Sequence, residues 1–262
     1  MAEFWRNTAL PHLEGRRSCQ ENPCYRPHAH DTFSIGLIDE GNSILSGPID
    51  GTIRLTTGDV ILIPSGQVHA CNPDKGRWLY QMIHMDQGWA ASLAPAGQSS
   101  DLFAQITVLR HPDLPGHIAN LNALVFADGT RERIEATFTS VLGALESLPA
   151  TYTAGTNADP QLLARLRPVM ERLRYDEANP VLDELAALAG MSRYQLDRAM
   201  RRATGLTPMA WRQNARIIHA RHLLRDGTPI AETAYALGFT DQSHFHRVFR
   251  AHVAATPGAY QG

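Results

Sequence analysis

The sequence predicts a two-domain protein, with a β-barrel and flanking helices first and an all-α domain second. Short apolar runs separated by Gly, Pro and Asp fill the first part, which is typical of a barrel or sandwich. Helix-period apolar patterns fill the last part. Between them, residues 151–160 are small and polar with no apolar period, which indicates a linker. We therefore predict domains over residues 1–150 and 161–262.

The barrel domain is predicted from short strands and one closing helix. We expect strands over the alternating or continuous apolar runs, at residues 32–38, 43–45, 52–55, 59–63 and 78–84. Residues 130–148 place apolar side chains at helical spacing. Packing on the barrel is the favoured role of that apolar stripe, and the stripe could also pair with the same helix of a second subunit in the homodimer that we expect.

The second domain begins with a helix–turn–helix pattern. Residues 181–189 form a short helix that ends at Gly190, and Ser192 caps a second helix over residues 193–202. Leu196 and Met200 form the inward stripe of this second helix. The side chains that face outward are mostly basic or polar: Arg193, Tyr194, Asp197, Arg198 and Arg201. A short helix, a Gly turn and an Arg-rich helix are typical of a DNA-binding unit.

The same pattern recurs near the end of the chain. Residues 230–237 form a helix, Gly238-Phe239 the turn, and Thr240-Asp241 the cap of a helix over residues 242–250. We expect Phe245, Val248 and Phe249 to face inward. Between the two units, residues 208–225 form a long helix, with Trp211, Ala215, Ile218, His222 and Leu223 at helical spacing. A continuous helix would hold the two units about one DNA turn, roughly 34 Å, apart.

Charge supports a nucleic-acid partner for the second domain only. Residues 1–160 carry 10 basic and 17 acidic side chains, a net charge of −7. Residues 161–262 carry 14 basic and 9 acidic side chains, a net charge of +5, and all 14 basic residues are Arg. The Arg fork suits both phosphate and guanine. The whole-chain charge of −2 hides this asymmetry.

These motifs carry a family resemblance. Ile230-Ala231-Glu232, Gly238-Phe239, Ser243-His244-Phe245, Arg247–Arg250 and Thr256-Pro257 make the segment 182–260 similar to the DNA-binding domain of the AraC/XylS family. The sequence departs from the family at Ala254, where Gly is usual, and at Gln261. The resemblance implies that base edges are read by Tyr194, Asp197 and Arg198 in the first unit and by Gln242, Ser243, His246 and Arg247 in the second. It also implies that phosphates are held by Arg193, Arg201 and Arg250.

The first domain resembles a cupin barrel. Residues 58–69 fit the cupin pattern G-x5-P-x-G-x2-H, and His28-Ala29-His30 resembles the start of the other cupin motif. His28, His30 and His69 are therefore expected at a ligand pocket, where three imidazoles could also hold a divalent metal. Ser34 and Ile35 stand where a metal-binding cupin carries Glu. A metal-free pocket for a small molecule is favoured, and Cys19, Cys24 or Cys71 could complete a metal site or sense oxidants.

Together these observations predict a sequence-specific transcription regulator, favoured as an activator, that is controlled by a small-molecule effector. Double-stranded DNA is the expected partner, RNA polymerase a further one, and no catalytic residues are expected. Three cysteines, no secretory leader and no apolar run of about 18 residues indicate the cytoplasm rather than a membrane. The alternatives are a metal-dependent cupin enzyme, dioxygenase-like or isomerase-like, with a DNA-binding tail, and an architectural DNA-binding protein without a ligand.

Overall fold

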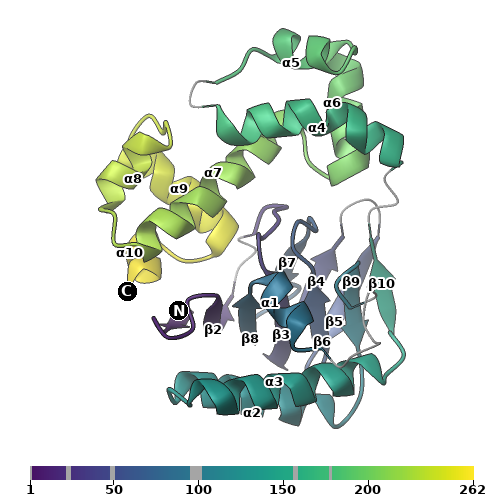
Figure 1. The fold of residues 1–262 in the computed structure, drawn as a ribbon, viewed down its shortest axis with the longest axis vertical. Coiled ribbons are helices and arrows are strands. Elements are labelled where there is room, and N and C mark those ends of the chain that lie inside the picture. The colour runs from purple at the N-terminus through teal and green to yellow at the C-terminus, as the bar shows by residue number, and fades with distance from the viewer. Residues whose placement is uncertain (1, 22–24, 48–50, 95–101, 156–158, 177–178) are drawn as a thin grey trace. The chain divides into compact units, whose positions relative to one another are not determined.

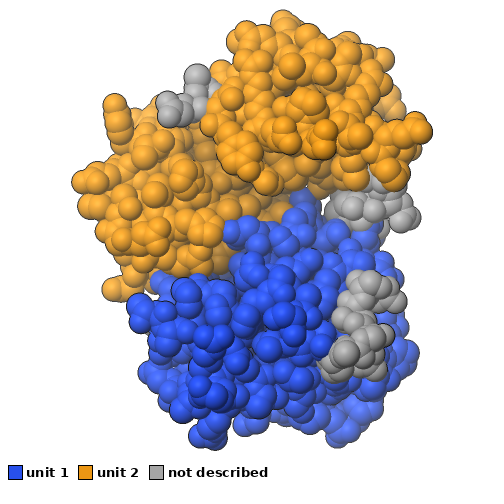
Figure 2. All heavy atoms as spheres, in the orientation of Figure 1, with its two compact units in different colours: residues 1–23, 30–47, 51–155 blue, residues 24–29, 48–50, 156–262 orange. Residues whose placement is uncertain are grey.

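A computed structural model describes residues 2–21, 25–47, 51–94, 102–155, 159–176 and 179–262. The chain divides into two compact units, shown in different colours in Figure 2. Unit 1 contains the described residues up to 155 except 25–29, and unit 2 contains residues 25–29 and 159–262. Among the described residues, every helix is too short or too polar to span a bilayer.

Unit 1 is built from two antiparallel sheets (Figure 1). The larger sheet, in spatial order, consists of β1 (Ala2–Arg6), β2 (Leu13–Gln20), β8 (Trp78–Met85), β3 (Phe33–Glu40), β6 (Val60–Ile63), β9 (Ile106–Leu109) and β10 (Tyr152–Ala154). The smaller sheet consists of β5 (Thr52–Thr56), β4 (Asn42–Ser46) and β7 (Ala70–Pro73). The predicted strands of this domain are thus present, and β1, β2, β7 and β9 are added to them.

The described residues of unit 1 also form three helices: α1 (Gln87–Ser92), α2 (Leu114–Phe126) and α3 (Arg131–Glu146). Figure 1 shows α2 and α3 side by side along one side of the barrel. The main core lies between these helices and one face of the larger sheet, where Phe33, Ile35 and Leu62 are fully buried with Phe138 and Leu142. Because side chains alternate along a strand, the neighbouring residues of the same strands point to the opposite face of this sheet.

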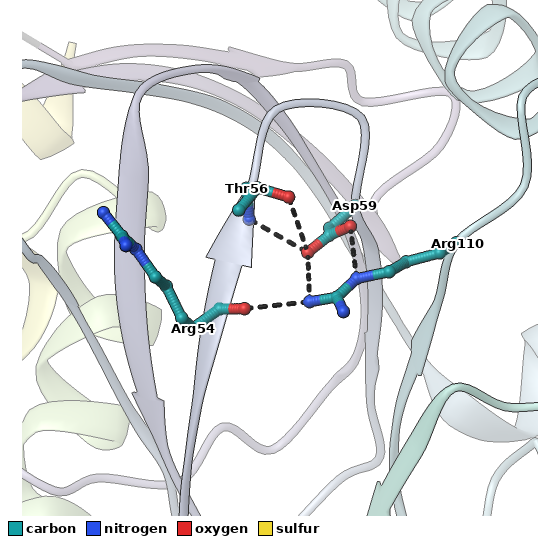
Figure 3. A network of polar contacts seen from close by, with 4 residues as sticks. All are labelled: Arg54, Thr56, Asp59 and Arg110. Carbon is teal, nitrogen blue, oxygen red and sulfur yellow. Dashed lines mark hydrogen bonds and ion pairs between the residues drawn. The ribbon is translucent and has the colours of Figure 1, made fainter.

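The buried carboxylate of Asp59 fixes the turn at which the expected cupin pattern begins (Figure 3). Asp59 accepts two hydrogen bonds from Arg110, at 2.9 Å from Nε and 3.0 Å from Nη2, and a third from the Thr56 backbone N–H at 2.9 Å. The same Arg110 donates to the Arg54 carbonyl at 2.9 Å. Gly58 supplies the left-handed backbone of the turn, with φ of +88°. The network ties the β5–β6 turn to the end of β9.

Unit 2 contains seven helices among its described residues. They are α4 (Pro160–Tyr175), α5 (Leu182–Leu188), α6 (Arg193–Thr204), α7 (Pro208–Arg225), α8 (Ile230–Ala236), α9 (Gln242–Val253) and α10 (Pro257–Gln261). The pairs α5–α6 and α8–α9 are the two predicted helix–turn–helix units, and α7 joins them (Figure 1). Gly190 and Gly238, with φ of +58° and +67°, form the two turns as expected.

The caps of the two second helices differ by one position. Ser192 accepts from the Gln195 backbone N–H, and the Gln195 side chain accepts from the Ser192 backbone in return. In the second unit Asp241 is the cap and accepts from the His244 backbone N–H at 2.7 Å. Thr240 instead contacts the His244 ring nitrogen Nδ1 through its hydroxyl at 2.9 Å. The second turn is therefore one residue longer than the first.

The inward stripes of two helices differ in part from the prediction. On α7, Ile217, Ala220 and Leu224 are buried, whereas His222 is exposed. This helix contacts α4, α6, α8, α9 and α10, so burial falls on several of its sides and no single apolar stripe describes it. On α9, Val248 is half-buried because it lies at the edge of the stripe formed by Phe245, Phe249 and Val253.

Two elements occupy the predicted linker region. Tyr152–Ala154 form β10, which pairs antiparallel with β9, and α4 begins at Pro160 behind an Asp159 cap. The backbone of β10 gains ladder hydrogen bonds that a linker lacks, which sequence composition alone does not reveal. The predicted domain boundaries stay a prediction.

Candidate DNA-binding helices and barrel histidines

Helix α6 presents the five predicted DNA-contacting side chains on its outer face. Its inner face is anchored by Leu196 and Met200, which are fully buried. The outward residues are exposed or half-buried: Arg193, Tyr194, Asp197, Arg198 and Arg201. The capping box at Ser192 fixes where this helix starts, and therefore which residues face outward.

Several of these side chains contact one another. Arg193 forms a two-pronged ion pair with Asp183 of α5. Arg201 pairs with Asp197 one turn earlier at 2.9 Å. The Arg198 guanidinium lies 5.5 Å from the centre of the Tyr194 ring. The basic groups of α6 are thus held by neighbours of the same unit.

Helix α9 presents its predicted DNA-contacting residues differently. Gln242, Ser243, His246 and Arg247 line one hollow on the protein surface. Gln242 and His246 approach each other at 3.5 Å, one helical turn apart. Arg247 and Arg250 are exposed, and within the described part of the chain neither forms an ion pair. The four residues predicted to read bases therefore line one hollow, and one of them, Arg247, is an accessible cation.

Two of the fourteen arginines in residues 161–262 are buried inside unit 2. Arg212 is 2% exposed and donates to the Leu173 carbonyl and the Asn179 side chain, both at 3.2 Å. Arg221 donates to the Tyr260 hydroxyl at 3.1 Å and lies over the ring of Tyr260. These two side chains hold helices together and are not available to a polyanion.

In unit 1 the structure brings together His30, His69 and His84. The ring centres of His30 and His69 are 5.0 Å apart, and those of His30 and His84 are 5.1 Å apart. Sequence reasoning missed His84, although it alternates along β8 with Trp78, Tyr80 and Met82 on the interior face. His28 belongs to unit 2, where its ring stacks on Tyr25 and its Nδ1 contacts the Arg26 carbonyl at 2.7 Å.

Two of the barrel histidines are oriented by hydrogen bonds. Nδ1 of His69 lies 3.0 Å from the Gln67 carbonyl, which identifies it as the protonated nitrogen. Burial lowers the pKa of His69 to about 4, so this imidazole is neutral at pH 7. Nδ1 of His84 lies 2.8 Å from the Ser34 hydroxyl. Imidazoles oriented in this way suit either metal coordination or hydrogen bonding to a small molecule, and both roles for His28, His30 and His69 stay predictions.

Two of the three cysteines lie in described strands of unit 1. Burial raises the pKa of the Cys71 thiol on β7 to about 12, which keeps it protonated and unreactive at neutral pH. Cys19 lies on β2, and Cys24 lies outside the described residues.

Comparisons with known proteins match both units. Residues 10–142 match the family model described as an AraC-like ligand binding domain, and residues 185–262 match a helix-turn-helix domain. The chain is 30% identical over 240 residues to the HTH-type transcriptional regulator YbfI of Bacillus subtilis (strain 168), covering 89% of this chain and 86% of the relative. The chain is an AraC-family transcription regulator.

Other relatives agree with this assignment. The arabinose operon regulatory protein of Salmonella typhimurium is 25% identical over 249 residues, which cover 90% of this chain and 85% of that protein. A solved structure of apo ToxT K231A from Vibrio cholerae superposes with a TM-score of 0.60 at 14% identity, over 95% of this chain and 97% of that one. The expected architecture, a barrel joined to two helix-turn-helix units, is confirmed. So is the function of an AraC-family regulator with a ligand-binding and a DNA-binding part.

Proposed function

We propose that this regulator activates transcription as a homodimer whose barrel responds to a small molecule. The observation that carries the DNA-binding part is the surface of α9, where four polar side chains, among them the accessible Arg247, line one hollow, and Arg250 is exposed on the same helix. Arg is bidentate to guanine and Gln to adenine in the major groove. Gln242 and Arg247 therefore supply the chemistry needed to read a base step.

In this proposal each helix-turn-helix unit contributes reading and anchoring residues. The base-reading set is Tyr194, Asp197 and Arg198 on α6 and Gln242, Ser243, His246 and Arg247 on α9. The phosphate-anchoring set is Arg193, Arg201 and Arg250. The 18 residues of α7 join the two units, and a straight helix of that length spans about 27 Å. A continuous helix of that length is a spacer that could hold the two reading helices about one DNA turn, roughly 34 Å, apart, so that they enter successive major grooves on one face of the duplex.

Activation and assembly are proposed from the relatives. Several relatives are named as activators, among them RhaS of Escherichia coli, which is 38% identical over 76 residues, 29% of this chain. We propose that this chain likewise activates transcription, that it contacts RNA polymerase when bound beside a promoter, and that it acts in the cytoplasm with the bacterial DNA.

The experiment is a gel shift and footprint on the DNA that flanks the gene, with and without candidate metabolites. We expect a protected region that spans two adjacent major grooves, and a change in affinity or footprint with the effector. A chain that binds this DNA no more tightly than random DNA of equal length would contradict the proposal.

A metal-dependent cupin enzyme is the second candidate, because the barrel gathers three imidazoles. Ser34 stands where a metal-binding cupin carries Glu, and its hydroxyl contacts His84. His30 and His69 could still hold a divalent ion, which would act as a Lewis acid. Stoichiometric iron in the purified protein together with oxygen consumption would favour this candidate, whereas metabolite-induced stabilisation without turnover favours the regulator.

A further inference from the structure

Residues 25–29 lie between β2 and β3 in the sequence, yet they belong to unit 2, which carries the two reading helices. Within this segment His28 and Ala29 are buried, at 4% and 5% exposure. The segment is also folded on itself, because the His28 ring stacks on Tyr25 and its Nδ1 contacts the Arg26 carbonyl at 2.7 Å. We name residues 25–29 the docked segment.

A buried amide of α7 holds the docked segment by its backbone. The Asn214 side chain is 6% exposed. Its Oδ1 accepts from the Ala29 backbone N–H at 3.0 Å, and its Nδ2 donates to the Ala29 carbonyl at 3.2 Å. Two opposite residues of antiparallel strands exchange hydrogen bonds in the same way. Loss of this amide would leave both backbone groups of Ala29 buried without these bonds, which is costly.

A second backbone contact completes the last turn of α9. The last four carbonyls of a helix have no N–H partner within the helix. In α9 the Ala254 N–H donates to the Arg250 carbonyl, and the Arg26 backbone N–H donates to the Ala251 carbonyl at 2.8 Å. The hollow predicted to read bases lies in the first half of the same helix. The docked segment therefore holds the C-terminal end of α9, away from the start of the reading surface.

The next residue along the chain, His30, is held in unit 1. Its carbonyl accepts from the Gly66 backbone N–H at 2.8 Å, and its ring centre lies 5.0 Å from that of His69. Consecutive residues, Ala29 and His30, are therefore anchored in different units. Because consecutive Cα atoms stay about 3.8 Å apart, a shift of His30 is passed on to Ala29.

We propose that the docked segment transmits the state of the barrel histidines to the reading helix α9. While it is docked, it fixes the end of α9 and supports DNA binding. A ligand that displaces His30 releases Ala29 from Asn214, which loosens the last turn of α9 and lowers the affinity for DNA. By linkage, DNA binding favours docking by the same factor. This inference rests on the proposed function of the barrel as a sensor, and it names the route by which the barrel acts.

The first test isolates the contact between the docked segment and α9. Arg26→Gln removes the charge and keeps the backbone N–H, whereas Arg26→Pro removes both, because proline has no N–H. Affinity of the full-length protein for the footprinted operator is measured by gel shift, with the Tm as a check of folding. We expect Arg26→Pro to bind at least about fivefold more weakly than Arg26→Gln.

Asn214→Ala tests the contact with Ala29, and Gln261→Ala is its matched control. Gln261 also donates its side-chain amide to a backbone carbonyl within unit 2, that of Thr228 at 2.9 Å, in a bond that does not include the docked segment. We expect Asn214→Ala to bind the operator at least about fivefold more weakly and Gln261→Ala to bind as the unchanged protein does. If Asn214→Ala does not fold, the Arg26 pair decides, because Arg26 is exposed.

Hydrogen exchange of peptides that cover residues 25–29 tests transmission in both directions. Operator DNA should slow exchange in the docked segment of the unchanged protein, and should not do so in Arg26→Pro. From the side of the barrel, His69→Ala removes a ring beside His30. We expect this variant to speed exchange in the docked segment and to weaken operator binding.

The inference is overturned if Arg26→Pro binds the operator as tightly as Arg26→Gln, or if a folded Asn214→Ala binds as tightly as Gln261→Ala. It is also overturned if exchange in residues 25–29 responds neither to operator DNA nor to His69→Ala. When the unchanged protein binds its operator, these outcomes leave the proposed function intact. If the unchanged protein binds the operator no more tightly than random DNA, the proposed function is contradicted and the inference falls with it.

Discussion

Ala254 occupies a backbone conformation that favours glycine. It ends α9 with φ of +52° and ψ of 28°, whereas Gly205 ends α6 with φ of +78°. A side chain in this left-handed region costs about 1–2 kcal/mol. Part of that cost is offset by the greater freedom of glycine in the unfolded chain. We expect Ala254→Gly to raise the free energy of unfolding by up to about 1 kcal/mol, measured by denaturant unfolding.

The reverse change at the matching position is the control for this prediction. Gly205→Ala should lower the free energy of unfolding by about 1 kcal/mol for the same steric reason. A loss of stability in Ala254→Gly would show that the Ala254 methyl group makes contacts worth more than the strain. The departure from the family pattern noted in the sequence thus corresponds to a specific backbone geometry.

Arg247 is the residue on which the proposed base reading depends most. It is exposed in the hollow of α9 and forms no ion pair with any described residue, so its removal should leave the fold intact. We expect Arg247→Ala to weaken specific binding by about 1–3 kcal/mol, measured by gel shift against the operator and a scrambled sequence. Arg250→Ala should instead weaken binding to both sequences about equally. Unchanged operator affinity in Arg247→Ala would contradict the assignment.

At the scale of elements, the two reading helices differ in how their cations are held. On α6, Arg193 pairs with Asp183 and Arg201 with Asp197, whereas Arg247 and Arg250 on α9 have no such partners among the described residues. The ion pair raises the pKa of Arg193 and lowers that of Asp183, chiefly through their hydrogen bonds. The carboxylates also repel the DNA backbone. We infer that α9 contributes more of the initial attraction.

Asp183→Asn tests this inference, because it removes the carboxylate and keeps the size of the side chain. We expect tighter binding and a steeper dependence of affinity on salt, since Arg193 then meets phosphate without competition. Asp226→Asn is a control, because it removes one negative charge at the far end of α7 from α6. Equal effects of the two substitutions would mean that net charge, and not release of Arg193, changes the affinity.

The elements of the chain were predictable where local patterns were strong. Both helix-turn-helix units, their Gly turns and the caps could be predicted, because each depends on residues within one turn of helix. The α7 stripe could not be predicted, since several packed helices bury different sides of it. Strands β1 and β2 also escaped prediction, because β2 carries Glu14, Arg16 and Ser18 where an apolar alternation was sought. The buried polar side chains of β2 obscured the alternation by which a strand is predicted.

For the whole molecule, the charge asymmetry predicted which unit binds DNA but overstated how many cations take part. Arg212 and Arg221 are buried, and Arg172 pairs with both Asp176 and Glu184. Whether an Arg faces solvent depends on packing that sequence does not reveal. Among the histidines of unit 1, His30 and His69 were expected near each other and their ring centres are 5.0 Å apart, whereas His84 joins them from a strand that carries no motif.

The number of arginines that contact phosphate sets how steeply DNA affinity is expected to fall as the salt concentration rises. Each neutralised phosphate contributes a slope of about −0.9 to log K against log salt. If only the three proposed anchors contact phosphate, the slope is about −2.7 per chain, and about −5.4 for a dimer that engages both copies. If all twelve outward arginines took part, the slope per chain would approach −11. Titrating a fluorescent operator duplex at several salt concentrations distinguishes these cases. A flat response would contradict DNA as the partner, and a slope near −11 would mean that the internal ion pairs open on binding.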